Sequence, residues 1–119
     1  MSPENEERAW PQRIRDMIEA SREIRSFVAG MSYEQFAADT KTQKAVLADF
    51  NIIGEAAAHI PESIKQAHPI VAWRQARAMR NVIVHVYFAV SAQTVWDTIA
   101  NDLPGMEVEL EQVLAHEGR

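Results

Sequence analysis

Apolar residues recur at intervals of three and four along most of this 119-residue chain, which is the spacing of one face of an α-helix. The first such segment follows Pro11 and ends near Gly30, and Pro in a first turn with Gly after a last turn suits helix ends. A second segment runs from about Thr42 to Ile60, where Pro61 breaks the pattern. The periodicity therefore predicts an all-helical fold.

Shorter helical segments are predicted around the second helix. The stretch Ser32-Tyr33-Glu34-Gln35 has the form of a capping box and should open a short turn, after which Asp39-Thr40 can cap the next helix. Between Pro61 and Pro69 there is room for only two turns, ending at or before His68.

The C-terminal half predicts two further helices. One runs from Trp73 to about His85, and another is capped by Ser91, bends at Pro104 and continues through Leu114. The run Val82-Ile83-Val84 would suit a strand, but no other segment resembles a partner strand for it. We predict an all-α helical bundle of four main helices with short helical turns.

The bulk composition limits the classes of protein that this chain can belong to. With 119 residues and 47% hydrophobic content, residues 1–119 should form a single domain with one core. Cysteine is absent, which excludes disulfides, thiolate metal sites and cysteine nucleophiles. Met1 to Arg15 is charged, and no stretch approaches the roughly 20 apolar residues of a membrane span. We therefore expect a cytoplasmic protein with no membrane partner.

Charge is distributed unevenly along the chain. The net charge of −5 argues against a protein that coats nucleic acid, because phosphate binding draws on clustered Lys and Arg. From Ser63 to Trp96, however, there is no Asp or Glu, whereas Asp97 to Glu117 holds six carboxylates. This asymmetry indicates a locally positive surface on an acidic body. The alternative is that the two segments are simply solvated faces of different helices.

Three polar residues of different chemistry converge within the segment that follows Trp73. Asn81 and His85 are four positions apart and would share a helix face, with Arg80 beside Asn81. Arg74, Arg77 and Arg80 step by three, so a basic stripe leads to the same place and could hold RNA phosphate.

These residue types can cleave RNA without a metal ion. Cleavage needs a base for the 2′-hydroxyl, an acid for the leaving oxygen and a positive group near the phosphorus. His85 can transfer protons near neutral pH, Arg80 can bind phosphate through its planar fork, and Asn81 can orient either one. Since each chain offers one such histidine, a symmetric dimer would supply separate acid and base. The alternative is that His85 is a hydrogen-bonded structural residue.

Met79 to Phe88 resembles the motif Arg-Asn, three residues, His, one residue, Tyr of the HepT branch of the HEPN superfamily. Similar landmarks follow the family in order and spacing through nearly the whole chain: Ala29 to Phe36, Asp39 to Gln43, Ile52 to Ala57, His68-Pro69 with Trp73-Arg74, and Val95-Trp96 with Asp102-Leu103-Pro104.

The resemblance implies a helical homodimer with a composite cleft and a metal-independent ribonuclease that acts as a toxin. It also implies an antitoxin partner of the minimal nucleotidyltransferase (MNT) class. Arg80 and His85 match the cleaving pair, Asn81 supports them, and Tyr87 matches the tyrosine that the antitoxin can modify with AMP. A phosphate-bearing group two residues from His85 would bring negative charge to the place of the RNA phosphate. The alternative for Tyr87 is core packing beside Phe88.

The chain also departs from the family pattern and leaves other readings open. Val82 replaces a residue that is often basic, and Val86 one that is often small or polar, which would weaken RNA contact and narrow the approach to Tyr87. A second functional hypothesis is therefore a non-catalytic partner of a nucleotidyltransferase that holds a nucleotide or phosphate.

A weaker alternative is a metal-dependent bundle enzyme based on two residues that lie four apart, Glu55 and His59. We expect neither metal nor cofactor, and we expect Glu55 to be buried against Arg80 or Asn81 in a supporting role. His68 and His116 are interpreted as structural or solvent residues.

Overall fold

The computed structural model describes residues 3–81 and 92–117, with side chains from Ala9 onward. All elements in these ranges are helical, which confirms the predicted all-α bundle. They are α1 (Pro3–Phe27), α2 (Tyr33–Ala37), α3 (Thr40–Ala58), α4 (Glu62–Ala67), α5 (Trp73–Ala78), the 3₁₀ helix η1 (Met79–Asn81), α7 (Ala92–Asn101) and α8 (Leu103–His116). None of the helices in the described ranges is long and apolar enough to cross a membrane.

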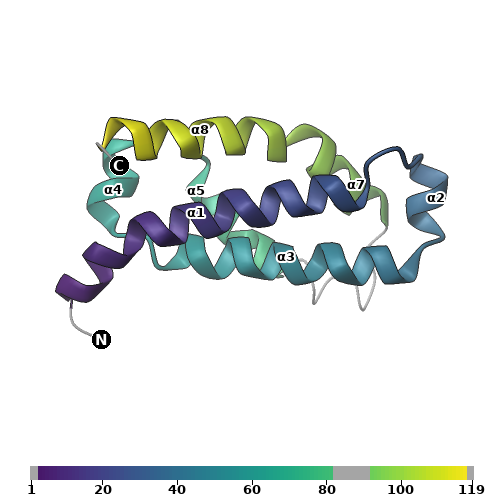
Figure 1. Ribbon diagram of the computed structural model, residues 1–119, viewed down its shortest axis with the longest axis horizontal. Coiled ribbons are helices and arrows are strands. Elements are labelled where there is room, and N and C mark those ends of the chain that lie inside the picture. The colour runs from purple at the N-terminus through teal and green to yellow at the C-terminus, as the bar shows by residue number, and fades with distance from the viewer. Residues whose placement is uncertain (1–2, 82–91, 118–119) are drawn as a thin grey trace.

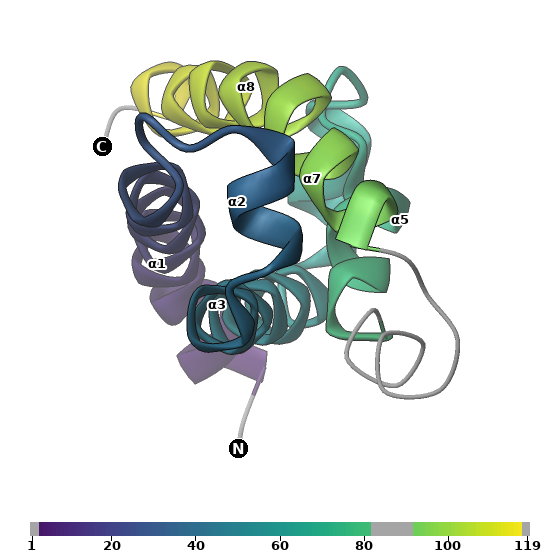
Figure 2. The ribbon, with the colours of Figure 1, turned by 90° about the vertical axis from the view of Figure 1, so that its right-hand side faces the viewer.

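Helix α1 lies between α3 and α8 along the 44 Å length of the molecule (Figure 1). Viewed down that length, α2 covers one end of the bundle, and α5 and α7 lie on the side opposite α1 (Figure 2). The largest fully buried side chains include Ile14, Met17 and Ile24 of α1, Phe36 of α2, Phe50 and Ile53 of α3, and Leu103 and Leu110 of α8. Each stabilises the fold by roughly 1.5–3 kcal/mol through removal of apolar surface from water.

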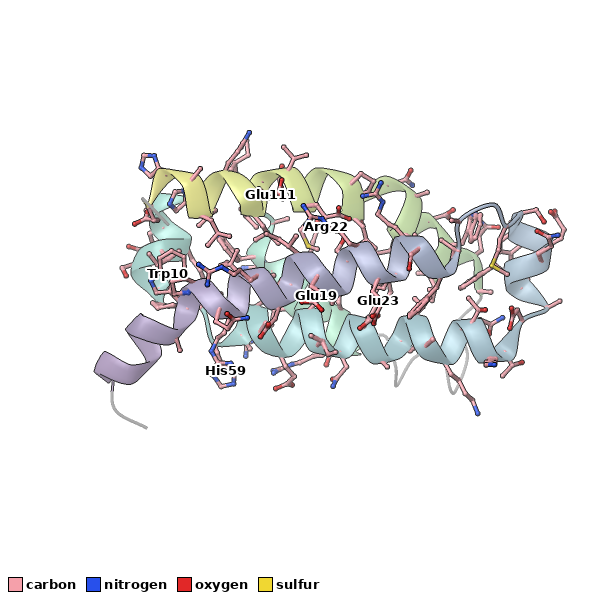
Figure 3. The ribbon with its side chains drawn as sticks, viewed as in Figure 1. Trp10, Glu19, Arg22, Glu23, His59 and Glu111 are labelled. Atoms are coloured by element: carbon pink, nitrogen blue, oxygen red, sulfur yellow. The ribbon has the colours of Figure 1, made fainter. Side chains whose placement is uncertain are left out.

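A buried carboxylate joins α1 to α8. Glu107 is 6% exposed, accepts a hydrogen bond from Ser21 Oγ at 2.6 Å and pairs with Arg25 Nη1 at 2.7 Å. Arg22 reaches toward it and pairs at the surface with Glu111, as the two labelled side chains in Figure 3 show. Ser21 and Arg25 thus satisfy the carboxylate of Glu107, because a buried charge is costly unless it is paired and hydrogen-bonded.

The N-terminal helix begins earlier than its sequence predicted. We expected Pro11 near the first turn, but α1 starts at Pro3 and contains Pro11 in its interior. Proline there removes one helical hydrogen bond, yet α1 continues through Pro11 as one α-helix. The predicted stop is confirmed, because Gly30 has a φ of 79°, which favours glycine.

The helix ends around α2, α3 and α4 are confirmed. Ser32 Oγ accepts from the Gln35 backbone N–H while the Gln35 side chain accepts from the Ser32 N–H, forming the capping box. Asp39 caps α3 by accepting from the Thr42 N–H at 3.0 Å, and the hydrogen bonds from Thr42 lower the pKa of Asp39. Helix α4 ends at Ala67, just before His68 and Pro69.

The third and fourth predicted helices need correction. The α-helix that starts at Trp73 ends at Ala78, because the chain tightens into η1, where the Met79 N–H already reaches the Ala76 carbonyl in the shorter 3₁₀ register. The remainder of the predicted Trp73–His85 helix, the alternative strand Val82–Val84 and the cap Ser91 lie outside the described residues. The last predicted helix is two helices, α7 and α8, which meet at Asp102, and Pro104 stands in the first turn of α8, where proline is tolerated.

Candidate functional site

A backbone contact between α3 and η1 fixes the position of Arg80. A Cβ atom added to Gly54 of α3 would lie 2.5 Å from the Arg80 backbone nitrogen, 2.6 Å from the Arg80 Cβ and 2.9 Å from the Arg77 carbonyl oxygen. Only a residue without a side chain lets the two segments approach this closely. Helix α3 accordingly packs against η1, which directly follows α5 (Figure 2). The backbone of Arg80 is therefore packed tightly against α3, which fixes where its side chain begins.

The side chain of Arg80 is tethered to the same helix. Its Nη1 atom donates to Glu55 Oε1 at 3.1 Å, with 30% of the Arg80 side chain and 52% of the Glu55 side chain exposed. The expected contact between these residues is present, but the expected burial of Glu55 is wrong, because Glu55 faces outward from α3. An ion pair this exposed contributes at most about 1 kcal/mol, so it orients Arg80 more than it stabilises the fold.

The two arginines of the basic stripe that lie on α5 are exposed, whereas Arg80 of η1 is partly buried. Arg74 and Arg77 of α5 point into solvent, and neither forms an ion pair with any residue in the described ranges. Asn81, the last residue of η1, is also exposed. The guanidinium groups of Arg74 and Arg77 are thus free to contact a polyanion, and exposed positive charge is what phosphate binding requires.

His85 and Tyr87 lie outside the described residues, as do Val82 and Val86. Among the described residues, Glu55 contacts Arg80, Asn81 follows Arg80 in η1, and Arg77 and Arg74 lie about one and two turns earlier. Asn81 lies in η1, and the expectation that Asn81 and His85 share one helix face stays a prediction, because His85 lies outside the described residues.

The alternative metal centre on α3 is not supported. Glu55 pairs with Arg80, and His59 is an exposed residue that ends α3 (Figure 3). Within the described ranges, neither belongs to a group of three side chains close enough to share an ion.

A second polar region, between α1 and α3, is acidic. A cavity of about 300 Å³ is lined by Asp16, Glu19, Glu23 and Asp49, and Figure 3 shows Glu19 and Glu23 on the side of α1 that faces α3. Asp49 is 4% exposed, and its Oδ2 atom lacks a hydrogen-bond partner among the described residues. Burial, a hydrogen bond with Glu23 and the nearby negative charges raise the pKa of Asp49 to about 7. This groove would repel RNA, so the arginine stripe is the better candidate interface.

Gly54 was missed as a determinant of the site by reasoning from the sequence. The feature that could have revealed it is a glycine inside an otherwise regular helical pattern. Such a glycine costs about 1 kcal/mol relative to alanine, so its presence suggests that close packing requires it. The surrounding segment Ile52 to Ala57 matched the family pattern, but the sequence alone did not show which segment approaches Gly54.

The family described as "Ribonuclease HepT-like" matches residues 17–113, an interval that includes the whole arginine stripe and α3. The chain belongs to this HepT-like ribonuclease family. It is 36% identical over 100 residues to a Thermococcus cleftensis protein named "Probable ribonuclease HepT", covering 84% of this chain and 91% of that one. It is also 31% identical over 112 residues to a Methanocaldococcus jannaschii protein named "Putative RNase", covering 94% and 90% of the two chains.

A third relative, from Caldanaerobacter subterraneus subsp. tengcongensis, bears the same RNase description and is 32% identical over 90 residues, covering 76% of this chain and 80% of that one. No solved structure matches the chain. Membership of the HepT-like family supports a ribonuclease function in general terms and RNA as the class of substrate.

Proposed function

We propose that this chain is a metal-independent endoribonuclease that acts as the toxin of a toxin–antitoxin pair, with residues 1–119 forming one HEPN-type domain. The observation that carries the proposal is the backbone contact at Gly54, which holds Arg80 in place on the outside of the bundle. A phosphate-binding arginine gains from such fixation, because a positioned group stabilises developing charge without having to reorganise.

Arg80 would bind the phosphate at the cleaved bond. Glu55 holds one arm of its guanidinium at 3.1 Å, and the group remains 30% exposed, so the other N–H groups are available to phosphate oxygens. Arg74 and Arg77, which are exposed on α5, would contact neighbouring phosphates and set the path of the RNA.

His85 would transfer the protons and Asn81 would orient the reacting groups. One imidazole cannot be base and acid in the same step, so we propose that two copies of the chain form a homodimer with a composite cleft. In that cleft the His85 residues of the two copies would take the two roles. This assignment is supported by the family resemblance of Met79 to Phe88 and by the chemistry of the residue types.

An MNT-type nucleotidyltransferase is the proposed antitoxin, and Tyr87 is its proposed target for modification with AMP. An adenylyl group there would place a negatively charged phosphate close to His85 and Arg80, where it would compete with the RNA phosphate for the same positive charge. The modified toxin would then be unable to bind RNA productively.

The test compares growth and RNA integrity after induction of the wild-type chain, His85→Ala, Arg80→Ala and Lys44→Ala. Lys44 is exposed on α3, so its replacement removes one positive charge outside the arginine stripe and controls for net charge. We expect wild type and Lys44→Ala to arrest growth and fragment total RNA, and the other two to do neither. Purified wild type should cleave RNA equally with and without a chelator.

Two outcomes would overturn the proposal. If His85→Ala cleaves RNA as well as wild type, His85 does not transfer protons. If neither wild type nor Lys44→Ala cleaves RNA, while the folded protein captures a nucleotidyltransferase, the non-catalytic binding partner becomes the better assignment. Circular dichroism of each variant, compared with wild type, distinguishes a loss of activity from a loss of helical structure.

A further inference from the structure

Two histidines and a glutamate meet where the C-terminal end of α8 lies beside α4 (Figure 1). His68 ends α4, His116 is the last residue of α8, and Glu117 follows it. One possible ligand atom from each of the three lies within 4.8 Å of the other two. His68 is 48 positions from His116 and 49 from Glu117, so the fold, not the local sequence, brings it to the other two.

The side chain of His68 is already in contact with the other two side chains of this cluster. His68 Nε2 lies 2.7 Å from Glu117 Oε2, and the His68 and His116 rings meet edge to face with centroids 5.1 Å apart. Only 11% of the His68 side chain is exposed, whereas His116 is exposed to solvent. The cluster therefore has a protected inner member and an open outer side.

The backbone of His68 is also held in place. Its N–H donates to the carbonyls of Ile64 and Lys65, and its carbonyl accepts from Trp73 Nε1 at 3.0 Å. An ion bound to His68 would consequently be linked, through this hydrogen bond, to Trp73, which is the first residue of the helix that carries Arg74 and Arg77.

We propose that His68, His116 and Glu117 bind a zinc-class divalent metal ion. Two imidazole nitrogens and one carboxylate oxygen form a ligand set that zinc accepts, with metal–ligand bonds of about 2.0–2.2 Å and a water at the remaining position. Bonds of that length separate the ligand atoms of a tetrahedral site by about 3.3 Å. Small side-chain rotations therefore suffice to reach coordination from the present separations.

The bound ion would join α4 and the loop before α5 to the end of α8, and so tie the start of the arginine-bearing helix to the bundle. We therefore expect its main effect on the stability of the fold. The inference stands apart from the proposed ribonuclease mechanism, which uses His85 and needs no metal. Chelation should lower thermal stability of the loaded protein without abolishing cleavage at temperatures where both forms are folded.

The experiment is calorimetric titration of the metal-free full chain with Zn²⁺, repeated on His68→Gln, His116→Gln, His59→Gln and His85→Gln. We expect one Zn²⁺ per chain for wild type, with affinity reduced at least about tenfold in the first two variants and unchanged in the last two. Titration with Co²⁺ should give the visible absorption bands of a four-coordinate site, and loss of those bands in Glu117→Gln identifies the carboxylate ligand.

Thermal unfolding provides an independent measure, because an ion that binds only the folded state raises the unfolding temperature. Zn²⁺ should raise it for wild type and His59→Gln, and much less for His116→Gln, whose exposed position makes misfolding an unsuitable explanation. Equal Zn²⁺ affinity in wild type and His116→Gln, or no Zn²⁺ binding to folded wild type, overturns the inference. Loss of binding only in His85→Gln would place the ion in the ribonuclease cleft instead.

Discussion

The backbone nitrogen of Arg80 lies so close to Gly54 that a Cβ atom there would approach it to 2.5 Å. The candidate arginine is thus placed by the absence of a side chain on a different helix. An ion pair to Glu55 adds orientation to this placement. The position of the guanidinium therefore depends both on the packing of α3 against η1 and on the charge of Glu55.

Replacing Gly54 with alanine should disrupt the site. The added methyl would contact backbone atoms of Arg80 and Arg77, which cannot move aside as a flexible side chain can. We expect Gly54→Ala to lose about 3 kcal/mol of unfolding free energy, measured by urea denaturation. Gly105→Ala is the control: a Cβ at Gly105 has no neighbour within 4 Å, and alanine in α8 should stabilise by up to about 1 kcal/mol. Equal stability of the two variants would contradict the close contact.

Glu55→Gln should distinguish the effect of Glu55 on the orientation of Arg80 from its effect on the stability of the fold. The Glu55–Arg80 pair is largely solvated, so its removal should change the unfolding free energy by less than about 1 kcal/mol. If Glu55 positions Arg80, the rate of RNA cleavage should nevertheless fall several-fold and should depend differently on salt. Glu62→Gln, on the exposed first turn of α4, removes the same charge elsewhere and should leave cleavage unaltered. The same loss of cleavage in both variants would show that only net charge matters.

The carboxylate between α1 and α8 should be important for stability. Glu107→Ala leaves the buried Ser21 hydroxyl unpaired and removes the partner of Arg25, so we expect a loss of about 2–3 kcal/mol. Glu111→Ala breaks only the exposed pair with Arg22 and should cost less than about 1 kcal/mol. Chemical denaturation of the two variants, side by side, measures the difference. A Glu107→Ala protein as stable as Glu111→Ala would mean that the network is replaced by water.

Asp49 should make stability depend on pH. Burial raises its pKa in the folded state to about 7 from an ordinary value of 3.8, so between these values the folded protein binds more protons than the unfolded chain. The contribution of Asp49 to stability therefore falls as the pH rises from about 4 to about 7. Asp49→Asn should remove this slope and stabilise the protein by about 1–2 kcal/mol at pH 8.

Glu23→Gln provides the matched test of that assignment. Since the hydrogen bond and negative charge of Glu23 help to raise the pKa of Asp49, the variant should show a shallower pH slope than wild type. Thermal melts at pH 5 and pH 8 measure both effects. A wild-type protein whose stability rises across this range, with no change in Asp49→Asn, would refute the role of Asp49.

Helix positions were largely predictable because their signals are local. Ser32 and Asp39 carry side chains that satisfy the first N–H groups of a helix, and Gly30 supplies the positive φ of a helix end, so α2, α3 and the end of α1 follow from sequence. The start of α1 did not follow, because an interior proline weakens a helix without always ending it. The change to 3₁₀ geometry at Met79 did not follow either, since close packing against Gly54 is a tertiary effect.

The candidate site was predictable in its chemistry but not in its geometry. Glu55 was expected to contact Arg80 or Asn81, and it contacts Arg80. Its exposure was not predicted, because the sequence does not show which way a polar residue on a packed helix faces. His68 and His116 were interpreted as structural or solvent residues, and their proximity to each other and to Glu117 was not predicted, because His68 is too distant in sequence to give a local signal. The roles of His85, Asn81 and Tyr87 stay predictions.

The placement of the core residues of α8 bears on when the candidate site is completed during synthesis. Helices α1 and α3 emerge from the ribosome before Arg80 and can pair early, since they are neighbours in sequence and in space. The buried Leu103, Leu110 and Glu107, however, all belong to α8. A nascent chain that has been translated as far as the arginine stripe thus still lacks the core residues of α8. We therefore expect the bundle to remain incompletely packed, and the candidate site inactive, until α8 has been translated.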